Sequence, residues 1–166
     1  MAPSEFTVAG ALVESSEGLL LVRNQRRGGA TDWSTPGGVI DATDATLRDG
    51  LAREVQEETG LRVTAWEGPL YEVRAVAHEL GWIMRCEVHR ALAYEGDVVV
   101  DDPDGIVVEA TFAAAAACTE FLALCAPWVR EPLADWIDQR WGPDQPRSYT
   151  YDVFGADRDD LRVVRV

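Results

Sequence analysis

The stretch from Gly37 to Leu61 constrains this chain more than any other part of the sequence. Its second half predicts the end of a helix, because Gly60 stands where a left-handed residue stops a helix and the apolar Leu61 follows it. The start is marked too, since Thr46 and Asp49 have the spacing of a capping box. The sequence therefore predicts one bounded helix that begins near Thr46 and ends before Gly60.

The acidic residues of this helix lie at the edge of its apolar stripe. At about 100° per residue, the stripe consists of Leu47, Leu51 and Val55. The acids beside it are Glu54, Glu57 and Glu58. Like charges on neighbouring turns repel one another, so they need a compensating charge. Arg53 can reach Glu57, and clustered carboxylates also suit Mg²⁺ or Mn²⁺. The alternative is an ordinary acidic face exposed to solvent.

The turn before the helix and the acids on it form one joint pattern. Pro36-Gly37-Gly38 precedes the helix, and R-E-x-x-E-E-x-G follows. The pattern resembles the Nudix box, G-x5-E-x7-R-E-U-x-E-E-x-G-U with U aliphatic, which is the signature of Nudix hydrolases. The second half matches at every specified position: Arg53, Glu54, Val55, Glu57, Glu58, Gly60 and Leu61.

The first half of the box departs from the family pattern. Counting back from Arg53 places the first glutamate of the box at Ala45 and its first glycine at Val39 rather than Gly38. One extra residue therefore lies between Gly38 and the helix. Either Asp44 replaces the missing glutamate, or Ala45 leaves that position empty. In the family this glutamate assists the metal cluster, so the departure concerns metal affinity and rate rather than fold.

The resemblance implies an α/β fold, the Nudix α/β/α sandwich with a mixed sheet, over residues 1–141. It implies hydrolysis of a nucleoside diphosphate linked to another group, by attack of water on phosphorus. The implied ligands of Mg²⁺ or Mn²⁺ are the carbonyl of Gly37 and the side chains of Glu54, Glu57 and Glu58. Arg53 would orient Glu57. The implied general base is Glu54 or a downstream acid, for which we expect Glu109, with Asp101, Asp102 and Asp104 as alternatives.

Three residues before the box are candidates for substrate binding. Arg23 and Arg26 belong to a basic segment of an otherwise acidic chain, and guanidinium groups bind phosphate in bidentate fashion. Of the two, we expect Arg23 to contact the phosphates. The alternative is a solvated hairpin loop. Trp33 could stack on a base, although a tryptophan at this place is also consistent with packing.

The remaining chain is predicted to extend the domain and then leave the family pattern. Strands are expected at 62–67, 70–78, 81–94 and 106–112, and helices at 119–124 and 129–141. Residues 142–146 break the chain, and a β-hairpin is expected at 148–154 and 161–166. The extension 142–166 could pack on the same domain, cap the substrate cleft, or pack on a partner in a homodimer.

Composition limits the partners of this chain. A net charge of -14 argues against nucleic-acid polymers and anionic membranes, which need a basic face. All 15 basic residues are arginine, which excludes chemistry based on a lysine nucleophile. Three cysteines without metal-ligand spacing indicate reduced thiols, and no run is long enough to span a membrane. These features predict a cytoplasmic protein, and the resemblance to the Nudix family implies a small nucleotide as its substrate.

Among nucleotides, (deoxy)nucleoside triphosphates are favoured, including oxidised purines such as 8-oxo-dGTP, because the family's markers for other substrates are not evident. Two other functions stay open at this point. The altered first half of the box is compatible with a Nudix-fold sensor that binds a nucleotide or nucleotide sugar without turnover. An acidic helix in a dimerisation domain is the structural alternative, for which Mg²⁺ would not matter.

Overall fold

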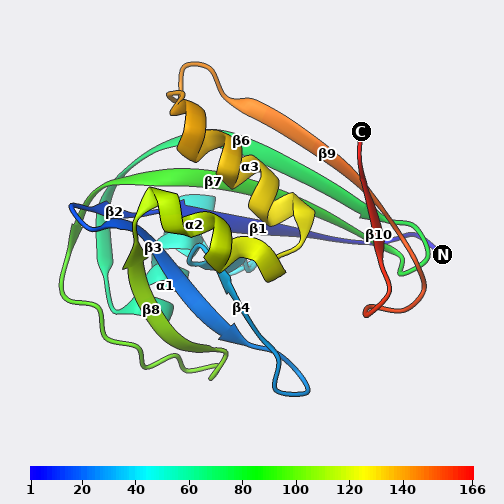
Figure 1. The fold of residues 1–166 in the computed structure, drawn as a ribbon, viewed down its shortest axis with the longest axis horizontal. Helices are drawn as coiled ribbons and strands as arrows, with labels where there is room; N and C mark the ends of the chain where they lie inside the picture. Colours follow the sequence, from blue (N-terminus) through cyan, green and yellow to red (C-terminus); the bar gives the residue numbers. More distant parts are fainter.

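The computed structural model describes all residues from Met1 to Val166, in two sheets and three α-helices (Figure 1). The strands are β1 (Ser4–Leu12), β2 (Glu14–Ser15), β3 (Gly18–Gln25), β4 (Thr31–Ser34), β5 (Gly37–Val39), β6 (Arg62–Ala77), β7 (Trp82–Glu95), β8 (Val107–Ala113), β9 (Arg147–Phe154) and β10 (Arg162–Arg165). The helices are α1 (Leu47–Thr59), α2 (Ala115–Phe121) and α3 (Pro127–Gln139), with a 3₁₀ turn at Leu122–Leu124 between the last two.

The larger sheet is mixed, as expected. Its strand order is β10-β9-β6-β7-β1-β5. β1 is parallel to β7 and β9 is parallel to β6, whereas β6 and β7 form a long antiparallel pair. The two strands expected at 62–67 and 70–78 are one strand, β6, whose register shifts between Glu67 and Tyr71. The smaller sheet joins β2, β3 and β4, with β8 paired to β3.

Helix α1 has the boundaries that the sequence predicts. The hydroxyl oxygen of Thr46 accepts the backbone N–H of Asp49 at 3.1 Å, which caps the first turn. Gly60 ends the helix in the left-handed conformation, with φ of 79°. Leu51 and Val55 are completely buried, so the predicted apolar stripe does face the core.

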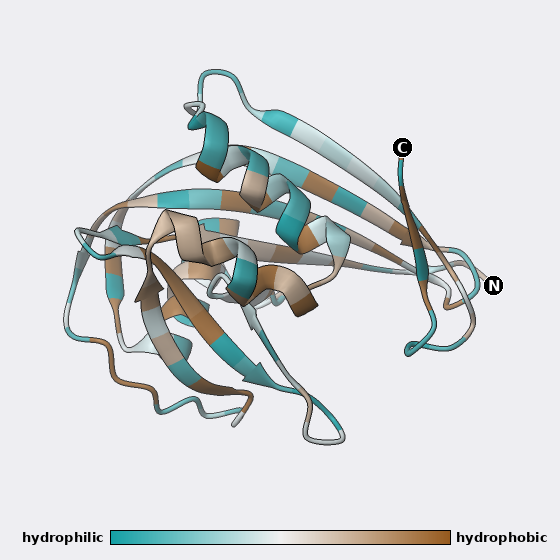
Figure 2. Ribbon diagram, in the orientation of Figure 1, coloured by the Kyte–Doolittle hydropathy of each residue, from teal (hydrophilic) through white to brown (hydrophobic).

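Helices cover both faces of the strands, which confirms the α/β/α arrangement. Helices α2 and α3 lie on one side of the sheets and α1 on the other (Figure 1). Helix α3 contributes its buried residues Leu133 and Trp136 to the core. β3 is hydrophobic over most of its length and hydrophilic at its C-terminal end (Figure 2), in keeping with buried Leu21 and the exposed Gln25.

The predicted hairpin at the C-terminal end is present and extends the chain's own sheet. β9 pairs with β6, so that Val73 lies beside Tyr149, and β10 pairs antiparallel with β9. Tyr149 and Tyr151 of β9 are buried. The structure therefore places the extension on the sheet of the same chain, while the domain boundary at residue 141 stays a prediction.

The helices near the C-terminal end differ in extent from those expected. The helix expected at 119–124 begins earlier, at Ala115, because a run of alanines has the highest helix propensity. The helix expected from residue 129 begins at Pro127, which suits the first helical position. None of the three helices combines the length and the apolar character that a bilayer span requires.

Candidate active site

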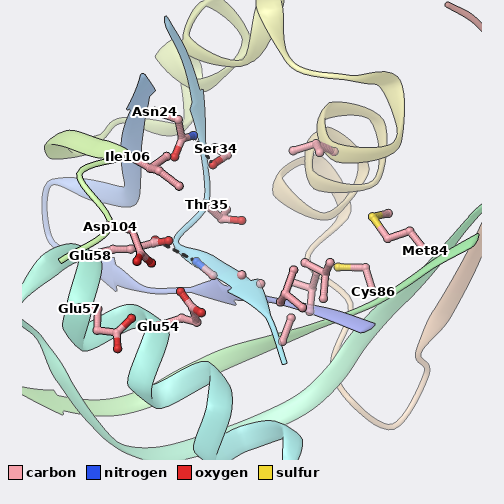
Figure 3. A pocket seen from close by; sticks show the side chains of 18 of the residues that line it. Asn24, Ser34, Thr35, Glu54, Glu57, Glu58, Met84, Cys86, Asp104 and Ile106 are labelled. Carbon is pink, nitrogen blue, oxygen red and sulfur yellow. Dashed lines mark hydrogen bonds between the residues drawn. The ribbon is translucent and has the colours of Figure 1, made fainter. Parts of the chain in front are cut away.

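A cavity of about 780 Å³ opens between α1, the glycine turn, the tips of β3 and β4, and the sheet beneath α3. It has two chemically different ends. Carboxylates of α1 lie at one end, and apolar side chains from β6, β7 and α3 line the other. Figure 3 shows Glu54, Glu57 and Glu58 on one side of this space and Met84 and Cys86 on the other.

The carboxylate end brings together the three acids predicted from the box. Glu58 is the most enclosed of them, and its Oε2 accepts the backbone N–H of Gly37 at 3.1 Å. Burial raises the pKa of Glu58 to about 8, and repulsion from Glu54 adds to the rise although the Gly37 N–H opposes it. Burial also raises the pKa of Glu54. In both cases burial disfavours the charged carboxylate, and a bound cation would favour it.

The glycine turn approaches these acids closely. A Cβ atom built on Gly38 would lie 2.7 Å from the carboxyl carbon and the Oε2 atom of Glu54. Any larger residue at position 38 would therefore displace the Glu54 carboxylate. The Pro-Gly-Gly turn and the helix thus fit together as one unit.

Arg53 holds the acidic side chains in place. Its Nη1 donates to Glu54 Oε1 at 3.1 Å and to Glu57 Oε2 at 3.4 Å, which agrees with the expected orienting role. Its Nε and Nη2 donate to both carboxylate oxygens of Asp44, at 3.1 and 3.0 Å. The guanidinium group lowers the pKa of Asp44, mainly through these hydrogen bonds.

The contact with Arg53 distinguishes between Asp44 and Ala45 as the residue at the position of the first glutamate of the box. Asp44 bonds to the arginine of the box, whereas Ala45 is exposed. Gly50, one turn before Glu54, makes room for this arrangement, since a Cβ atom there would lie 2.6 Å from Asp44 Oδ2. The loop before α1 thus has one extra residue and an aspartate, Asp44, where the family has a glutamate. Gly50 of α1 leaves the space that the Asp44 carboxylate occupies.

The structure separates the downstream acids. Glu109 does not line the cavity, because it forms an ion pair of 2.9 Å with Arg23 across β3 and β8. Asp102 lines the cavity, but its carboxylate accepts three backbone N–H groups of its own loop. Asp104 also lines the cavity and lies beside Glu58 in Figure 3. Asp104 is thus better placed than Glu109 to act with the α1 acids.

The three candidate substrate-binding residues have different positions. Arg26 lines the cavity, where Asp32 holds it by two hydrogen bonds of 2.8 and 3.0 Å. Arg23 is outside the cavity, paired with Glu109. Trp33 does not line it either, because it packs edge-on against Phe121 with ring centroids 4.9 Å apart.

The apolar end contains residues that the sequence patterns did not identify as part of a site. They are Tyr71, Val73, Met84, Cys86, Val88, Trp128 and Val129. The sequence signal available for this wall was the apolar character of every second residue along parts of β6 and β7, since residues two apart on a strand share one face. No charged side chain belongs to this group, and burial raises the pKa of the Cys86 thiol to about 12, so it is neutral.

The donor set fits a hard divalent cation that is also bound by substrate. No three side chains of His, Cys, Asp or Glu form a preformed cage. Mg²⁺ does not require one, because proteins usually hold it through one or two carboxylates together with waters and substrate phosphates. Glu54, Glu57 and Glu58 supply such carboxylates, with Arg53 as the positive side chain beside them.

Comparison with known proteins supports the family. The model of the NUDIX domain matches residues 5–117. A MutT-like protein of Streptomyces ambofaciens is 46% identical over 57 residues, which is 34% of each chain, so the present chain matches about a third of that relative's length.

Two solved structures share the fold at low identity. A mutator MutT protein from Bacillus halodurans has a TM-score of 0.65 and 19% identity, over 95% of this chain and 97% of that one. A MutT NUDIX hydrolase from Burkholderia pseudomallei has a TM-score of 0.63 and 23% identity, over 82% and 98%. The family match covers most of the chain and includes the glycine turn and α1, so this chain belongs to the NUDIX domain family, the family of the Nudix pyrophosphohydrolases.

Proposed function

We propose that this chain hydrolyses a (deoxy)nucleoside triphosphate, oxidised purines such as 8-oxo-dGTP included, by attack of water on phosphorus with the help of Mg²⁺ or Mn²⁺. The observation that carries the proposal is the cavity with two unlike ends. Three carboxylates of one helix lie at one end, and an uncharged apolar wall lies at the other. A polyphosphate and a ring joined in one molecule would match both ends.

The residues of the carboxylate end have distinct roles in this proposal. Glu57 and Glu58, with Glu54 and the Gly37 carbonyl, would hold the cation, and Arg53 would orient Glu54 and Glu57. A bound divalent ion neutralises charge on the phosphates and lowers the pKa of water. Glu54 or Asp104 would accept the proton of the attacking water. Arg26 would contact the phosphates, since it is the cavity-lining member of the arginine pair proposed for that role.

The test is release of phosphate or pyrophosphate from a panel of nucleotides with Mg²⁺, with Mn²⁺ and with EDTA. The panel contains the normal triphosphates, 8-oxo-dGTP, ADP-ribose, NADH and nucleotide sugars. Metal-dependent release from the triphosphates would support the proposal, and release from another class would replace the substrate. No release from any nucleotide, combined with a nucleotide-dependent rise in melting temperature, would favour a binding domain instead.

Cellular location and assembly stay predictions. A cytoplasmic location and a possible homodimer follow from the sequence patterns alone. Sedimentation of the purified chain would test the second of these.

A further inference from the structure

The apolar end of the cavity contains a polar group that the protein does not satisfy. Tyr71 lines the cavity and is 3% exposed, yet no hydrogen bond within the protein engages its hydroxyl. The hydroxyl oxygen is not itself fully enclosed, since the one fully buried polar side-chain atom without a partner is Arg23 Nε. The Tyr71 hydroxyl is therefore accessible from the cavity, where a ligand can accept its hydrogen bond.

The other tyrosines provide an internal comparison. Tyr94 donates to the carbonyl of Glu14 at 2.9 Å. Tyr149 donates to Asp135 at 3.0 Å, and Tyr151 donates to Glu131 at 3.3 Å. The chain has four tyrosines, so the three that do not line the cavity are all satisfied and the one that does is not.

The Tyr71 ring is fixed by its neighbours. It makes an edge contact with Trp141, at 6.2 Å between centroids, and another with Tyr149, at 6.0 Å. A ring held on two sides cannot turn freely to find another partner. Burial holds the pKa of Tyr71 well above its ordinary value, so the group is a neutral O–H donor.

The surroundings of this hydroxyl define the ligand chemistry. The wall beside it includes Val73, Met84 and Cys86, and no charged side chain lines this end. A charged group would lose its hydration here without compensation, whereas an uncharged flat ring would pack against the wall.

We infer that the Tyr71 hydroxyl is a specificity-determining group, which donates a hydrogen bond to an acceptor atom on the uncharged ring of the substrate. The inference rests on the proposed function, because the phosphates of the same molecule would lie at the carboxylate end. Through this hydrogen bond the apolar end would distinguish rings that have an acceptor atom near the Tyr71 hydroxyl from rings that do not.

The test compares the wild-type chain with Tyr71→Phe and with the control Tyr149→Phe. Tyr149 is the matched control because its ring contacts Tyr71, whereas its hydroxyl donates to Asp135 outside the cavity. Loss of one hydrogen bond should raise KM about twofold to tenfold for the preferred triphosphate. We expect kcat to stay constant, because the ring is remote from the reacting phosphorus. Tyr149→Phe should leave KM unchanged.

The inhibition constant of tripolyphosphate separates ring recognition from general distortion, since this molecule has phosphates but no ring. It should be the same for the wild type and Tyr71→Phe. An equal weakening of tripolyphosphate, or an unchanged KM for every triphosphate, would overturn the inference while leaving the proposed function intact.

Failure of the proposed function would give a different result. The wild type would then release nothing from any nucleotide with either metal. Calorimetric titration with the same triphosphates would then decide the inference, because weaker binding by Tyr71→Phe alone would support it. Equal binding by all three proteins, or no binding at all, would overturn it.

Discussion

The glycine turn and the three α1 carboxylates at one end of the cavity come from one continuous stretch of chain, whereas the apolar end is assembled from β6, β7 and α3. Gly37 and Glu58 are 21 residues apart in sequence, while Tyr71 of β6 and Val129 of α3 belong to separate elements that line the same cavity. The first end therefore depends on local geometry, namely a glycine turn and a capped helix. The second end depends on strand register and on how α3 packs. Substitutions at the two ends should consequently change different kinetic constants.

The largest expected effect is loss of turnover when a carboxylate of α1 is neutralised. Glu58→Gln should lower kcat/KM by more than about a hundredfold, since even the outer partners of metal ligands contribute 10–100-fold. The fold should stay intact, because the amide can still accept the N–H of Gly37. Turnover assays with Mg²⁺ and circular dichroism would test both statements. Normal turnover in this variant would contradict the site assignment.

A second difference between the ends is the pH dependence that Glu58 gives to stability. Its pKa is about 8 in the folded chain, against an ordinary value of 4.5. Between these values the folded state holds one proton more than the unfolded state, so the free energy of unfolding falls as pH rises from about 4.5 to about 8. The fall should amount to a few kcal/mol in EDTA.

Urea unfolding at several pH values would measure this fall. Glu58→Gln has no titrating group at this position and should lose that part of the slope, whereas a variant at the apolar end such as Val129→Ala should keep it. An identical slope in the wild type and Glu58→Gln would show that other groups cause the dependence.

The clamp that Asp44 forms with Arg53 should have an intermediate effect. Asp44→Ala should lower kcat/KM about tenfold to a hundredfold, because Arg53 would no longer be held towards Glu54 and Glu57. Gly50→Ala should reproduce part of this loss, since its methyl group would displace the Asp44 carboxylate.

Position 45 provides the matched control for Asp44. Ala45→Glu should be neutral while Asp44 is present, and it should not restore activity to Asp44→Ala, because residue 45 is exposed. If the double variant regained activity, residue 45 would instead be the functional position of the first glutamate of the box.

The smallest effect should come from Glu109, one of the acids downstream of the box. Glu109→Gln should change kcat/KM less than about twofold, because Glu109 forms only a half-exposed ion pair with Arg23. Asp104→Asn should cost more, since Asp104 lines the cavity beside Glu58. Parallel rate measurements over pH would rank the two acids, and a larger loss for Glu109→Gln would reverse the assignment.

Sequence reasoning succeeded where the physical signal was local. The capping residue Thr46, the terminating Gly60 and the stripe of Leu51 and Val55 each act within one helix, and all were predicted correctly. The mixed sheet followed from the resemblance to the Nudix family, and the C-terminal hairpin followed from strand and turn patterns. Asp44 was one of two alternatives, because a one-residue shift cannot be resolved without knowing which side chain reaches Arg53.

Sequence reasoning was weaker where the signal came from pairing of distant strands. Glu109 and Arg23 were plausible site residues in the sequence, but the antiparallel register of β3 and β8 places them opposite each other and outside the cavity. The apolar wall could not be read from one segment, because Tyr71 and Met84 lie on different strands and Trp128 on a helix.

The position of α3 has a consequence for how this chain can change over time. The segment that matches the family ends at residue 117, before α3 begins at Pro127, yet α3 contributes Trp128 and Val129 to the cavity. β9, which also lies beyond that segment, supports Tyr71 through Tyr149. If the proposed function holds, mutations in the last third of the gene would alter which ring the apolar end accepts while the stretch from Gly37 to Leu61 keeps its sequence. Substrate choice and catalysis would then evolve separately.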